Sequence, residues 1–354
     1  MQQLIESMRS MSYDRLLDRK ASFIVGSAVS IASAKERIRI LLDRNPKSFS
    51  RMEEKAFLQS VMASNAIEGI YTSDERLQGI IGRTTEPRDH DEQAIAGYRD
   101  ALEYILREYD SIEISESTIL ELHRRVMSHT PEGGGQYKDR DNVIVETDVY
   151  GNRRIRFRPV SSEDTPWAME QLILSYTAAS QERVEPLLLI PCFILDFLCI
   201  HPFLDGNGRV SRLLTVLLFC KAGYHIVRYC SFEERIYRNL RRYYETISES
   251  NVEWHEGTND YSSFLNYYLF VLDMCCKDAE GMFSTISEKR ATKKNRVESV
   301  VLKSLFPISK KEIMDVLPDI SQTTVEACLH HMLKEGSIEK LGGNRNARYR
   351  KKTQ

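Results

Sequence analysis

Twelve consecutive residues, 201–212, constrain the possible fold and function of this 354-residue chain more than any other part of it. They read His-Pro-Phe-Leu-Asp-Gly-Asn-Gly-Arg-Val-Ser-Arg, so they combine a titratable base, a carboxylate, two glycines in a turn and two arginines. Residues 210–222 then show apolar side chains at helical spacing, and Gly223 follows where a helix usually stops. The turn at 206–208 is therefore predicted to lie at the N-terminus of this helix.

A helix that begins after such a turn is well suited to bind phosphate. Its first amides have no acceptor within the helix, and the helix dipole is positive at this end. Gly206 and Gly208 allow a ligand to approach the backbone closely. Arg209 and Arg212 are three residues apart on one face of the helix, and each guanidinium can bind two phosphate oxygens.

Two further side chains of the segment suit phosphate chemistry. Asp205 offers a hard oxygen ligand for Mg²⁺. His201 has an ordinary pKa of about 6.5, which allows it to take a proton near neutral pH. Each residue by itself also has a structural explanation, as part of a turn or of a solvated helix face. Their combination in one short segment favours a phosphate-handling active site.

The segment resembles the core motif of the Fic family, His-x-Phe-x-Asp/Glu-Gly-Asn-Gly-Arg-x-x-Arg, and it matches every defining position. The resemblance implies a mainly α-helical fold with a β-hairpin flap. It also implies an enzyme that transfers AMP from ATP to a Ser, Thr or Tyr hydroxyl of a target protein, itself included, with release of pyrophosphate. In-line attack on the α-phosphorus requires positioned donors and a cation, but no covalent nucleophile.

The same resemblance assigns roles to single residues. It implies that His201 is the general base for the target hydroxyl and that Asp205 holds Mg²⁺. It implies a phosphate site made by Gly206, Asn207, Gly208, Arg209 and Arg212. Of these, Arg212 is expected to bind the γ-phosphate.

A second motif lies upstream, at residues 64–69, which read Ser-Asn-Ala-Ile-Glu-Gly. It is similar to the family's inhibitory sequence, Ser/Thr-x-x-x-Glu-Gly/Asn, with Ser64, Glu68 and Gly69 at the defining positions. Residues 51–67 are predicted to form a helix that stops at the glycine, which places the Glu68 carboxylate at the negative end of the dipole. The resemblance implies that Glu68 pairs with Arg212 and keeps it from the γ-phosphate. The alternative is an ordinary exposed glutamate before a capping glycine.

Residues 142–160 contain two short runs typical of β-strands, at 143–145 and 155–158, on either side of Tyr-Gly-Asn at 150–152. They predict a β-hairpin in an otherwise helical stretch. In the Fic family a hairpin flap of this kind covers the nucleotide, which implies that Val143 and Ile144 lie next to it. An exposed strand edge can also bind an extended target through main-chain hydrogen bonds. A purely structural hairpin is the alternative.

Three residues further along match positions that hold the adenosine portion in family members. They are Tyr243, Tyr244 and Asn251. The alternative for the two tyrosines is a place in the core, because aromatic rings on a helix usually pack there.

Composition limits the class of protein. Hydrophobic residues make up 42% of the chain, which is enough to build ordinary soluble cores, and the net charge of -2 is uninformative. The seven cysteines show no metal-type pairs and predict reduced thiols in a cytoplasmic protein. The first nine residues do not resemble a signal peptide. The apolar run 186–200 is shorter than the ~20 residues of a membrane span and predicts a buried helix that leads into His201.

The chain is expected to divide into three parts. Residues 1–95 would form a helical region that carries the inhibitory helix, residues 96–285 the catalytic core, and residues 295–354 a separate small domain. The polar run at 287–295 marks the change in composition.

The last part resembles a winged helix-turn-helix. Helices are predicted at 297–306, 310–316 and 321–334, and strands at 338–341 and 347–350 flank a Gly-Gly-Asn tip at 342–344. Residues 290–354 contain fourteen Lys and Arg against seven Asp and Glu, a net charge of +7. This surplus suits contacts to DNA phosphates, and residues 321–324 would lead a recognition helix. Such domains also serve in protein docking or in homodimerisation, so both uses stay open.

Two classes of function therefore compete. The first is an autoinhibited AMP-transferring enzyme with ATP as donor and Mg²⁺ as cofactor, whose C-terminal domain selects targets or location. The second is a DNA-binding regulator that senses nucleotide and seldom turns over. His201 favours the enzyme, because nucleotide sensing alone requires no general base. An enzyme that moves another phosphate-containing group, or that removes AMP with Glu68 positioning water, is a variant of the first class.

Overall fold

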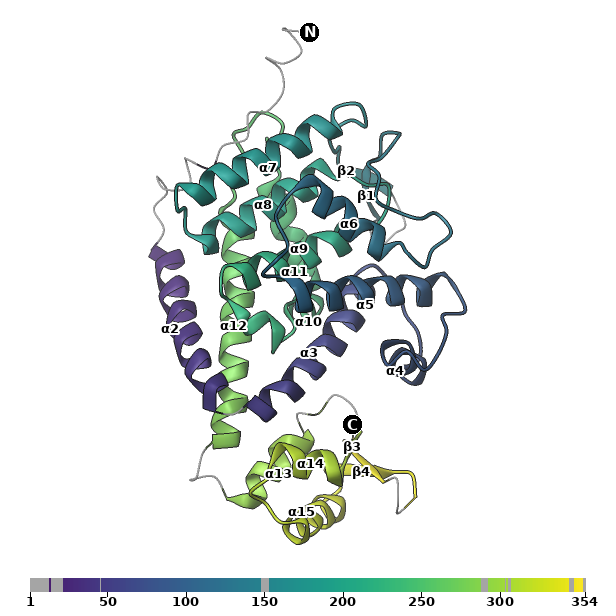
Figure 1. Cartoon of the computed structure of the whole chain (residues 1–354), viewed down its shortest axis with the longest axis vertical. Coiled ribbons are helices and arrows are strands. Elements are labelled where there is room, and N and C mark those ends of the chain that lie inside the picture. Colours follow the sequence, from purple (N-terminus) through teal and green to yellow (C-terminus); the bar gives the residue numbers. More distant parts are fainter. Residues whose placement is uncertain are drawn as a thin grey trace. The chain divides into compact units, whose positions relative to one another are not determined.

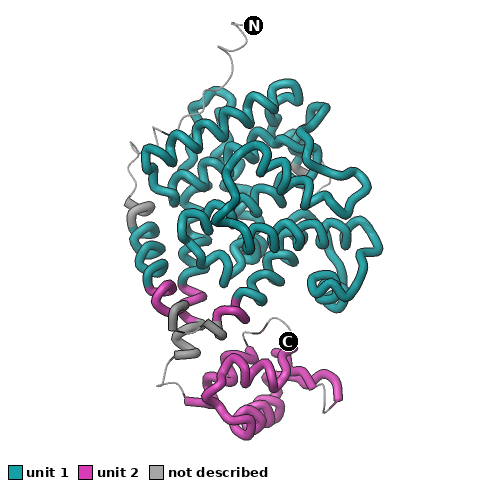
Figure 2. Tube along the Cα trace, in the orientation of Figure 1, with its two compact units in different colours: residues 1–36, 53–276 teal, residues 37–52, 277–354 magenta. Residues whose placement is uncertain are grey.

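The computed structural model describes residues 13, 22–44, 46–147, 153–287, 292–302, 304, 307–343 and 347–352 (Figure 1). These residues are mostly helical, with two small antiparallel sheets. The chain divides into two compact units, one of residues 1–36 and 53–276, the other of residues 37–52 and 277–354 (Figure 2). The boundary expected near residue 95 falls inside the continuous helix α5 (His90–Glu108).

The first unit is built mainly of helices. Those that lie at least partly in it are α2 (Ser22–Arg44), α3 (Pro46–Ile67), α4 (Asp74–Ile81), α5, α6 (Glu116–Val126), α7 (Thr165–Gln181), α8 (Pro186–Ile200), α9 (Asn207–Lys221), the 3-10 helix η2 (His225–Arg228), α10 (Phe232–Arg238), α11 (Leu240–Ser250) and α12 (Ser262–Ser287). Helix α9 is central, since α5, α6 and α8 all pack against it. From Val210 to Cys220 every side chain of α9 is buried.

Helix α8 is the buried helix predicted at 186–200, and it ends directly before His201. Its Asp196 side chain is completely buried and accepts hydrogen bonds from Tyr13 Oη at 2.8 Å and from Trp254 Nε1 at 2.6 Å. Tyr261 Oη lies 2.9 and 3.0 Å from the two carboxylate oxygens. A buried carboxylate with this many donors stays stable in the core, so it fixes the helix that carries the predicted base.

The predicted hairpin is present. Strands β1 (Ile144–Thr147) and β2 (Arg153–Phe157) are antiparallel, with Val145 opposite Ile155 and an irregularity between Ile144 and Val145. The expected tip at 150–152 lies outside the described residues.

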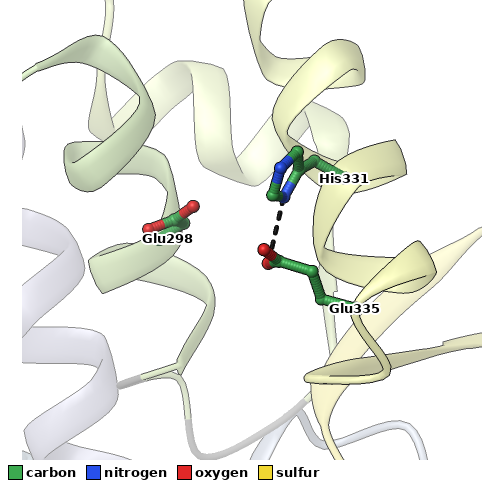
Figure 3. Close-up of side chains that lie close together, drawn as sticks. All are labelled: Glu298, His331 and Glu335. Atoms are coloured by element: carbon green, nitrogen blue, oxygen red, sulfur yellow. Dashed lines mark ion pairs between the residues drawn. The ribbon is translucent and has the colours of Figure 1, made fainter.

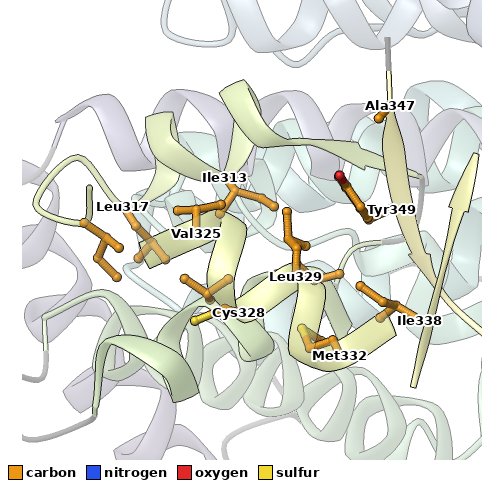
Figure 4. Close-up of a cluster of buried hydrophobic side chains, with 12 residues drawn as sticks. Ile313, Leu317, Val325, Cys328, Leu329, Met332, Ile338, Ala347 and Tyr349 are labelled. Carbon is orange, nitrogen blue, oxygen red and sulfur yellow. The ribbon is translucent and has the colours of Figure 1, made fainter. Parts of the chain in front are cut away.

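The second unit contains α13 (Lys293–Leu302), α14 (Lys310–Val316), α15 (Gln322–Lys334) and a three-stranded sheet. The sheet has the order β3 (Ile308–Ser309), β5 (Arg348–Lys351), β4 (Ile338–Leu341). Apolar side chains from all three helices and from β4 and β5 form one core (Figure 4). Helix α14 has the predicted bounds, α15 starts one residue later behind its cap Ser321, and α13 starts four residues earlier than predicted.

Two expectations from composition can be compared with the described residues. All seven cysteines are among them, all are buried, and none forms a disulfide. In the described part of the chain, no helix combines the length and the apolar character that crossing a membrane requires.

Candidate active site

His201 lies in the turn between α8 and α9 and has an uncommon backbone conformation. Its φ is 52° and its ψ is 61°, which is the left-handed region. Its amide donates to Phe197 O at 2.9 Å and closes the end of α8. A left-handed residue other than glycine costs about 1 kcal/mol or more, so the surrounding contacts must hold it.

The His201 imidazole is set up to accept a proton. Its Nδ1 lies 3.2 Å from Leu198 O, and a carbonyl only accepts, so Nδ1 carries the hydrogen and Nε2 carries the lone pair. Burial lowers the pKa of His201 to about 4. The ring is therefore neutral at pH 7, in the tautomer that a general base requires.

The turn itself is closed by Asn207. Its Oδ1 accepts from the Phe203 amide at 2.9 Å, and its Nδ2 donates to Phe203 O at 2.7 Å. The resemblance implies that Asn207 takes part in the phosphate site, and both ends of its side-chain amide bind the backbone of the turn. A phosphate contact from this residue would thus come from its main-chain N–H, at the start of α9.

Gly206 shows why the turn needs a glycine. Its φ is 82°, and an added Cβ would lie 3.4 Å from the ring of His123. That ring stacks on Phe203 with centroids 3.7 Å apart and planes 13° apart. His123 Nδ1 accepts from the Gly135 amide at 3.0 Å, and burial lowers the pKa of His123 to about 4. The neutral imidazole of His123 therefore packs against both Gly206 and Phe203 of the turn.

Arg209 and Asp205 form an ion pair across one turn, with Nη2 and Oδ2 2.7 Å apart. Arg209 is 1% exposed, and its Nε and Nη1 are buried without a hydrogen-bond partner. Buried guanidinium N–H groups without acceptors are costly, which indicates a site that an anion completes.

Asp205 suits the magnesium expected from the sequence. Its side chain is 61% exposed, and one carboxylate together with phosphates and water is a common donor set for Mg²⁺. Asp205 is the residue that would hold the ion, and the ion would supply positive charge beside the phosphates.

The end of α3 reaches the same site. Gly69 has a φ of 76°, and the amide of Ile70 donates to Asn65 O at 3.0 Å, which terminates the helix in the predicted place. Glu68 Oε1 lies 2.7 Å from Arg212 Nη2. An added Cβ at Gly208 would lie 2.2 Å from the same oxygen, so the carboxylate rests on the turn where α9 begins.

Ser64 holds Arg212 as well. The Arg212 Nε donates to Ser64 Oγ at 2.8 Å and its Nη2 donates to Ser64 O at 2.9 Å. The Arg212 side chain is 1% exposed, whereas that of Glu68 is 32% exposed. The predicted pair of Glu68 and Arg212 is thus present, and Ser64 contributes two of the three contacts between α3 and the arginine.

The three expected adenosine contacts have different surroundings. Tyr243 is 2% exposed and packs against Phe264 and Tyr267 in the core. The Tyr244 hydroxyl lies 3.5 Å from Ile67 O, at the end of α3. Asn251 terminates α11, where its amide donates to the helix.

The hairpin is attached to α11 through Arg156 of β2, which hydrogen-bonds Tyr244 O and Ser248 Oγ. Its Val143, Val145 and Ile155 side chains are 44%, 40% and 48% exposed. Val145 and Ile155 are paired across the two strands, so these two apolar side chains lie on the same side of the ribbon.

Lys138 is a residue of the site that the sequence motifs do not predict. It lies between α6 and β1, is 4% exposed, and its ammonium contacts the carbonyls of Ile200 and His201. The sequence around it gives no signal for this role, because both partners are more than sixty residues away.

Among the described residues, one group of possible metal ligands lies close together in the second unit (Figure 3). It consists of Glu298, His331 and Glu335, whose ligand atoms all lie within 4.8 Å of one another. The ammonium of Lys294 lies 3.3 Å from His331 Nε2 and 3.6 Å from Glu298. His331 Nδ1 lies 3.0 Å from Glu335. A lysine already supplies the positive charge there, so the group is explained without a metal ion.

Comparison with known proteins agrees with the geometry of the turn. The Fic/DOC family matches residues 113–219, which include α6, the hairpin, α8 and α9 up to Phe219. The chain is 29% identical over 213 residues to a protein adenylyltransferase Fic of Nematostella vectensis, covering 57% of this chain and 45% of that protein. It is 30% identical over 183 residues to the protein of the same name of Drosophila yakuba, covering 49% and 34%. The chain thus spans less than half the length of these curated relatives.

Solved structures of Fic proteins resemble this chain over a larger part of its length than the curated relatives do. A Fic family protein from Desulfovibrio desulfuricans G20 has a TM-score of 0.62 at 18% identity, covering 95% of this chain and 98% of that one. A Fic domain containing signaling protein from Bacteroides thetaiotaomicron has a TM-score of 0.56 at 24% identity, covering 71% and 97%. Together these findings support a Fic domain with a mainly helical Fic fold.

Proposed function

We propose that this protein is an autoinhibited adenylyltransferase that transfers AMP from ATP to a hydroxyl side chain of a target protein. The observation that carries the proposal is the neutral His201 beside the start of α9, where Arg209 has buried N–H groups without acceptors. A base and an incomplete anion site at one turn are what nucleotidyl transfer to a hydroxyl requires.

In the proposed reaction the target hydroxyl attacks the α-phosphorus of ATP. His201 Nε2 takes the hydroxyl proton as the new O–P bond forms, and the bond from the α-phosphorus to the bridging oxygen breaks, so pyrophosphate leaves. The first amides of α9 and the Arg209 guanidinium stabilise the negative charge that develops on the phosphates. Bound at Asp205, Mg²⁺ would neutralise part of the same charge.

The inhibitory part of the proposal rests on Glu68. Its carboxylate binds Arg212 and rests against Gly208, so a γ-phosphate on Arg212 would have to replace it. In this arrangement ATP binds poorly or with its α-phosphorus away from His201. Movement of Glu68 away from the arginine is then the activating step.

The hairpin is proposed as the place where the target binds. Its two strands are both edge strands within the described two-stranded sheet, so either one offers main-chain groups to an extended segment. Main-chain pairing would align a hydroxyl with His201 and require little of the target sequence.

The test uses self-labelling of the full-length chain with ATP labelled on the α-phosphate or on the γ-phosphate. We expect α-label only, weak in the unchanged chain, stronger in Glu68→Gly and absent in Glu68→Gly with His201→Ala. Glu75→Gln, a change at an exposed glutamate of α4, is the control. Label from the γ-phosphate would identify phosphate transfer instead, and no label with ATP still bound would favour nucleotide sensing.

Removal of AMP is tested with the same material. If Glu68 positions water rather than inhibiting, labelled protein will lose AMP when the unchanged chain is added and will keep it when Glu68→Gly is added. If the two additions act alike, Glu68 has no hydrolytic role.

For the second unit we propose a winged helix-turn-helix that docks DNA. The support is the order of α13, α14, α15 and the β4–β5 ribbon, together with the surplus of positive charge in residues 290–354. The exposed side chains at the start of α15, Gln322 and Thr323, are neutral and polar, which suits contacts to base edges. Duplex binding by the full-length chain should weaken steeply between 50 and 200 mM salt. Absence of binding at low salt would favour protein docking.

A further inference from the structure

One buried lysine contacts the backbone at three consecutive residues of the turn that contains His201. Lys138 Nζ lies 3.2 Å from Ile200 O and 3.0 Å from His201 O. The Lys138 amide donates to Pro202 O at 2.9 Å. The third acceptor of the ammonium is Asn142 Oδ1, at 3.1 Å.

These contacts meet a need of the turn. The last carbonyls of a helix have no partner within the helix, and the helix dipole is negative at this end, so an ammonium is favourable there. His201 in addition has a strained, left-handed backbone. An ammonium has three N–H donors, and the three acceptors use all of them.

Asn142 extends the contacts of Lys138 to the next residue of the turn. Asn142 accepts from Lys138 through Oδ1 and donates through Nδ2 to Phe203 O at 3.1 Å. The segment that holds Lys138 and Asn142 therefore reaches the carbonyls of residues 200, 201, 202 and 203. It is a clamp on the backbone, and no side chain of the clamp touches the imidazole Nε2.

We propose that Lys138 is a positioning residue for His201. Its ammonium keeps the backbone of the turn in the conformation in which Nδ1 faces Leu198 O and Nε2 is presented as a base. The inference rests on the proposed function, in which His201 takes the hydroxyl proton. Lys138 lies outside both sequence motifs, so the proposal adds a new residue to the active site.

The electrostatic surroundings support this role. Burial lowers the pKa of Lys138 to about 8, which Asp141 of the same segment partly opposes. From the end of α8 the facing titratable group is His201, and the charge of Lys138 helps to lower the pKa of that imidazole, whereas Glu68 and Asp205 raise it. Above pH 8 the lysine becomes a neutral amine with two donors for three acceptors, so the clamp weakens.

The first experiment requires no turnover. The imidazole ¹⁵N signals of His201 are followed by NMR against pH in the full-length chain, in Lys138→Arg and in Lys138→Met. In the unchanged chain we expect Nδ1–H as the main tautomer and a second inflection near pH 8. Lys138→Arg should keep the tautomer and lose that inflection, because arginine stays charged.

In Lys138→Met the loss of the positive charge should raise the pKa of His201 and reduce the Nδ1–H tautomer. The matched control is Lys221→Met. Lys221 also donates to two backbone carbonyls, those of Tyr109 and Asp110, but at the far end of α9. His201 signals that are the same in Lys138→Met as in Lys221→Met would overturn the proposal.

The second experiment measures AMP transfer in the Glu68→Gly background. Lys138→Met should lower kcat tenfold or more and change KM for ATP by less than twofold, because the lysine touches no phosphate-binding group. Lys138→Arg should recover most of kcat and extend activity above pH 8. Circular dichroism and the melting temperature verify that each variant is folded.

The two proposals can fail separately. If Glu68→Gly transfers no AMP, the proposed function fails, and the NMR titration still decides whether Lys138 sets the state of His201. If Glu68→Gly is active and Lys138→Met matches it in kcat and pH profile, Lys138 has no positioning role.

Discussion

Replacement of Glu68 measures how strongly α3 restrains Arg212. Two changes are informative: Glu68→Gly removes the carboxylate, whereas Glu68→Gln keeps its size and one acceptor but removes the charge. In both variants Arg212 retains its contacts with Ser64. Only the contact at 2.7 Å between Glu68 Oε1 and Arg212 Nη2 is altered.

A hydrogen bond between charged groups typically contributes about 1.5–3 kcal/mol, and about 1.4 kcal/mol corresponds to a tenfold change. If a γ-phosphate must displace Glu68, Glu68→Gly should therefore raise AMP transfer by about 10- to 150-fold. Glu68→Gln should give a smaller rise, because its amide oxygen still accepts from Arg212. Glu75→Gln should have no effect.

The assay combines initial rates at subsaturating ATP with dissociation constants for ATP and ADP. ADP has no γ-phosphate, so removal of Glu68 should strengthen ATP binding and leave ADP binding nearly unchanged. Equal gains for the two nucleotides would refute competition for Arg212, even if the rate of transfer increased. An unchanged rate would refute inhibition by Glu68 altogether.

Three further predictions follow from burial and packing. Burial holds the pKa of His201 at about 4 and removal of the Glu68 charge lowers it further, so Glu68→Gly should keep its activity as pH falls to about 4. An acid limb of the pH–rate profile near 6.5 would contradict the neutral base. Gly97→Ala should destabilise the chain by about 1–3 kcal/mol in urea unfolding, since its Cβ would lie 2.0 Å from Val126 O. Gly26 has open space around it, so Gly26→Ala should leave the free energy of unfolding unchanged or raise it. If Gly97→Ala and Gly26→Ala change the free energy of unfolding equally, the packing argument is wrong. Asp196→Asn should cost about 2 kcal/mol or more, because its amide would face hydroxyl and indole donors, and an unchanged urea midpoint would show that the network is dispensable.

The local parts of the site could be predicted from the sequence. The Glu68–Arg212 pair was implied by the resemblance of two motifs to the Fic family, and the C-terminal ends of α3 and α9 were predicted from the glycines at 69 and 223. The pairing of Asp205 with Arg209 was within reach as well, because residues four apart on a helix meet on one face, although it was not predicted.

Other features depend on contacts between distant segments and leave no local pattern. Lys138 belongs to the site because the chain folds back so that it meets the end of α8. Strand β3 has two residues, which is too short for any alternation to appear.

The enclosure of Arg212 has a consequence for how the site responds to its surroundings. Dissolved ions screen exposed charges over a Debye length of about 8 Å at physiological salt, but they act little on a charge that they cannot approach. Arg212 is 1% exposed, so the contact with Glu68 should persist at salt concentrations that dissolve surface pairs such as Arg350–Glu339. Fluctuations in ionic strength would then leave the restraint in place, and its release requires Glu68 to move away from the arginine.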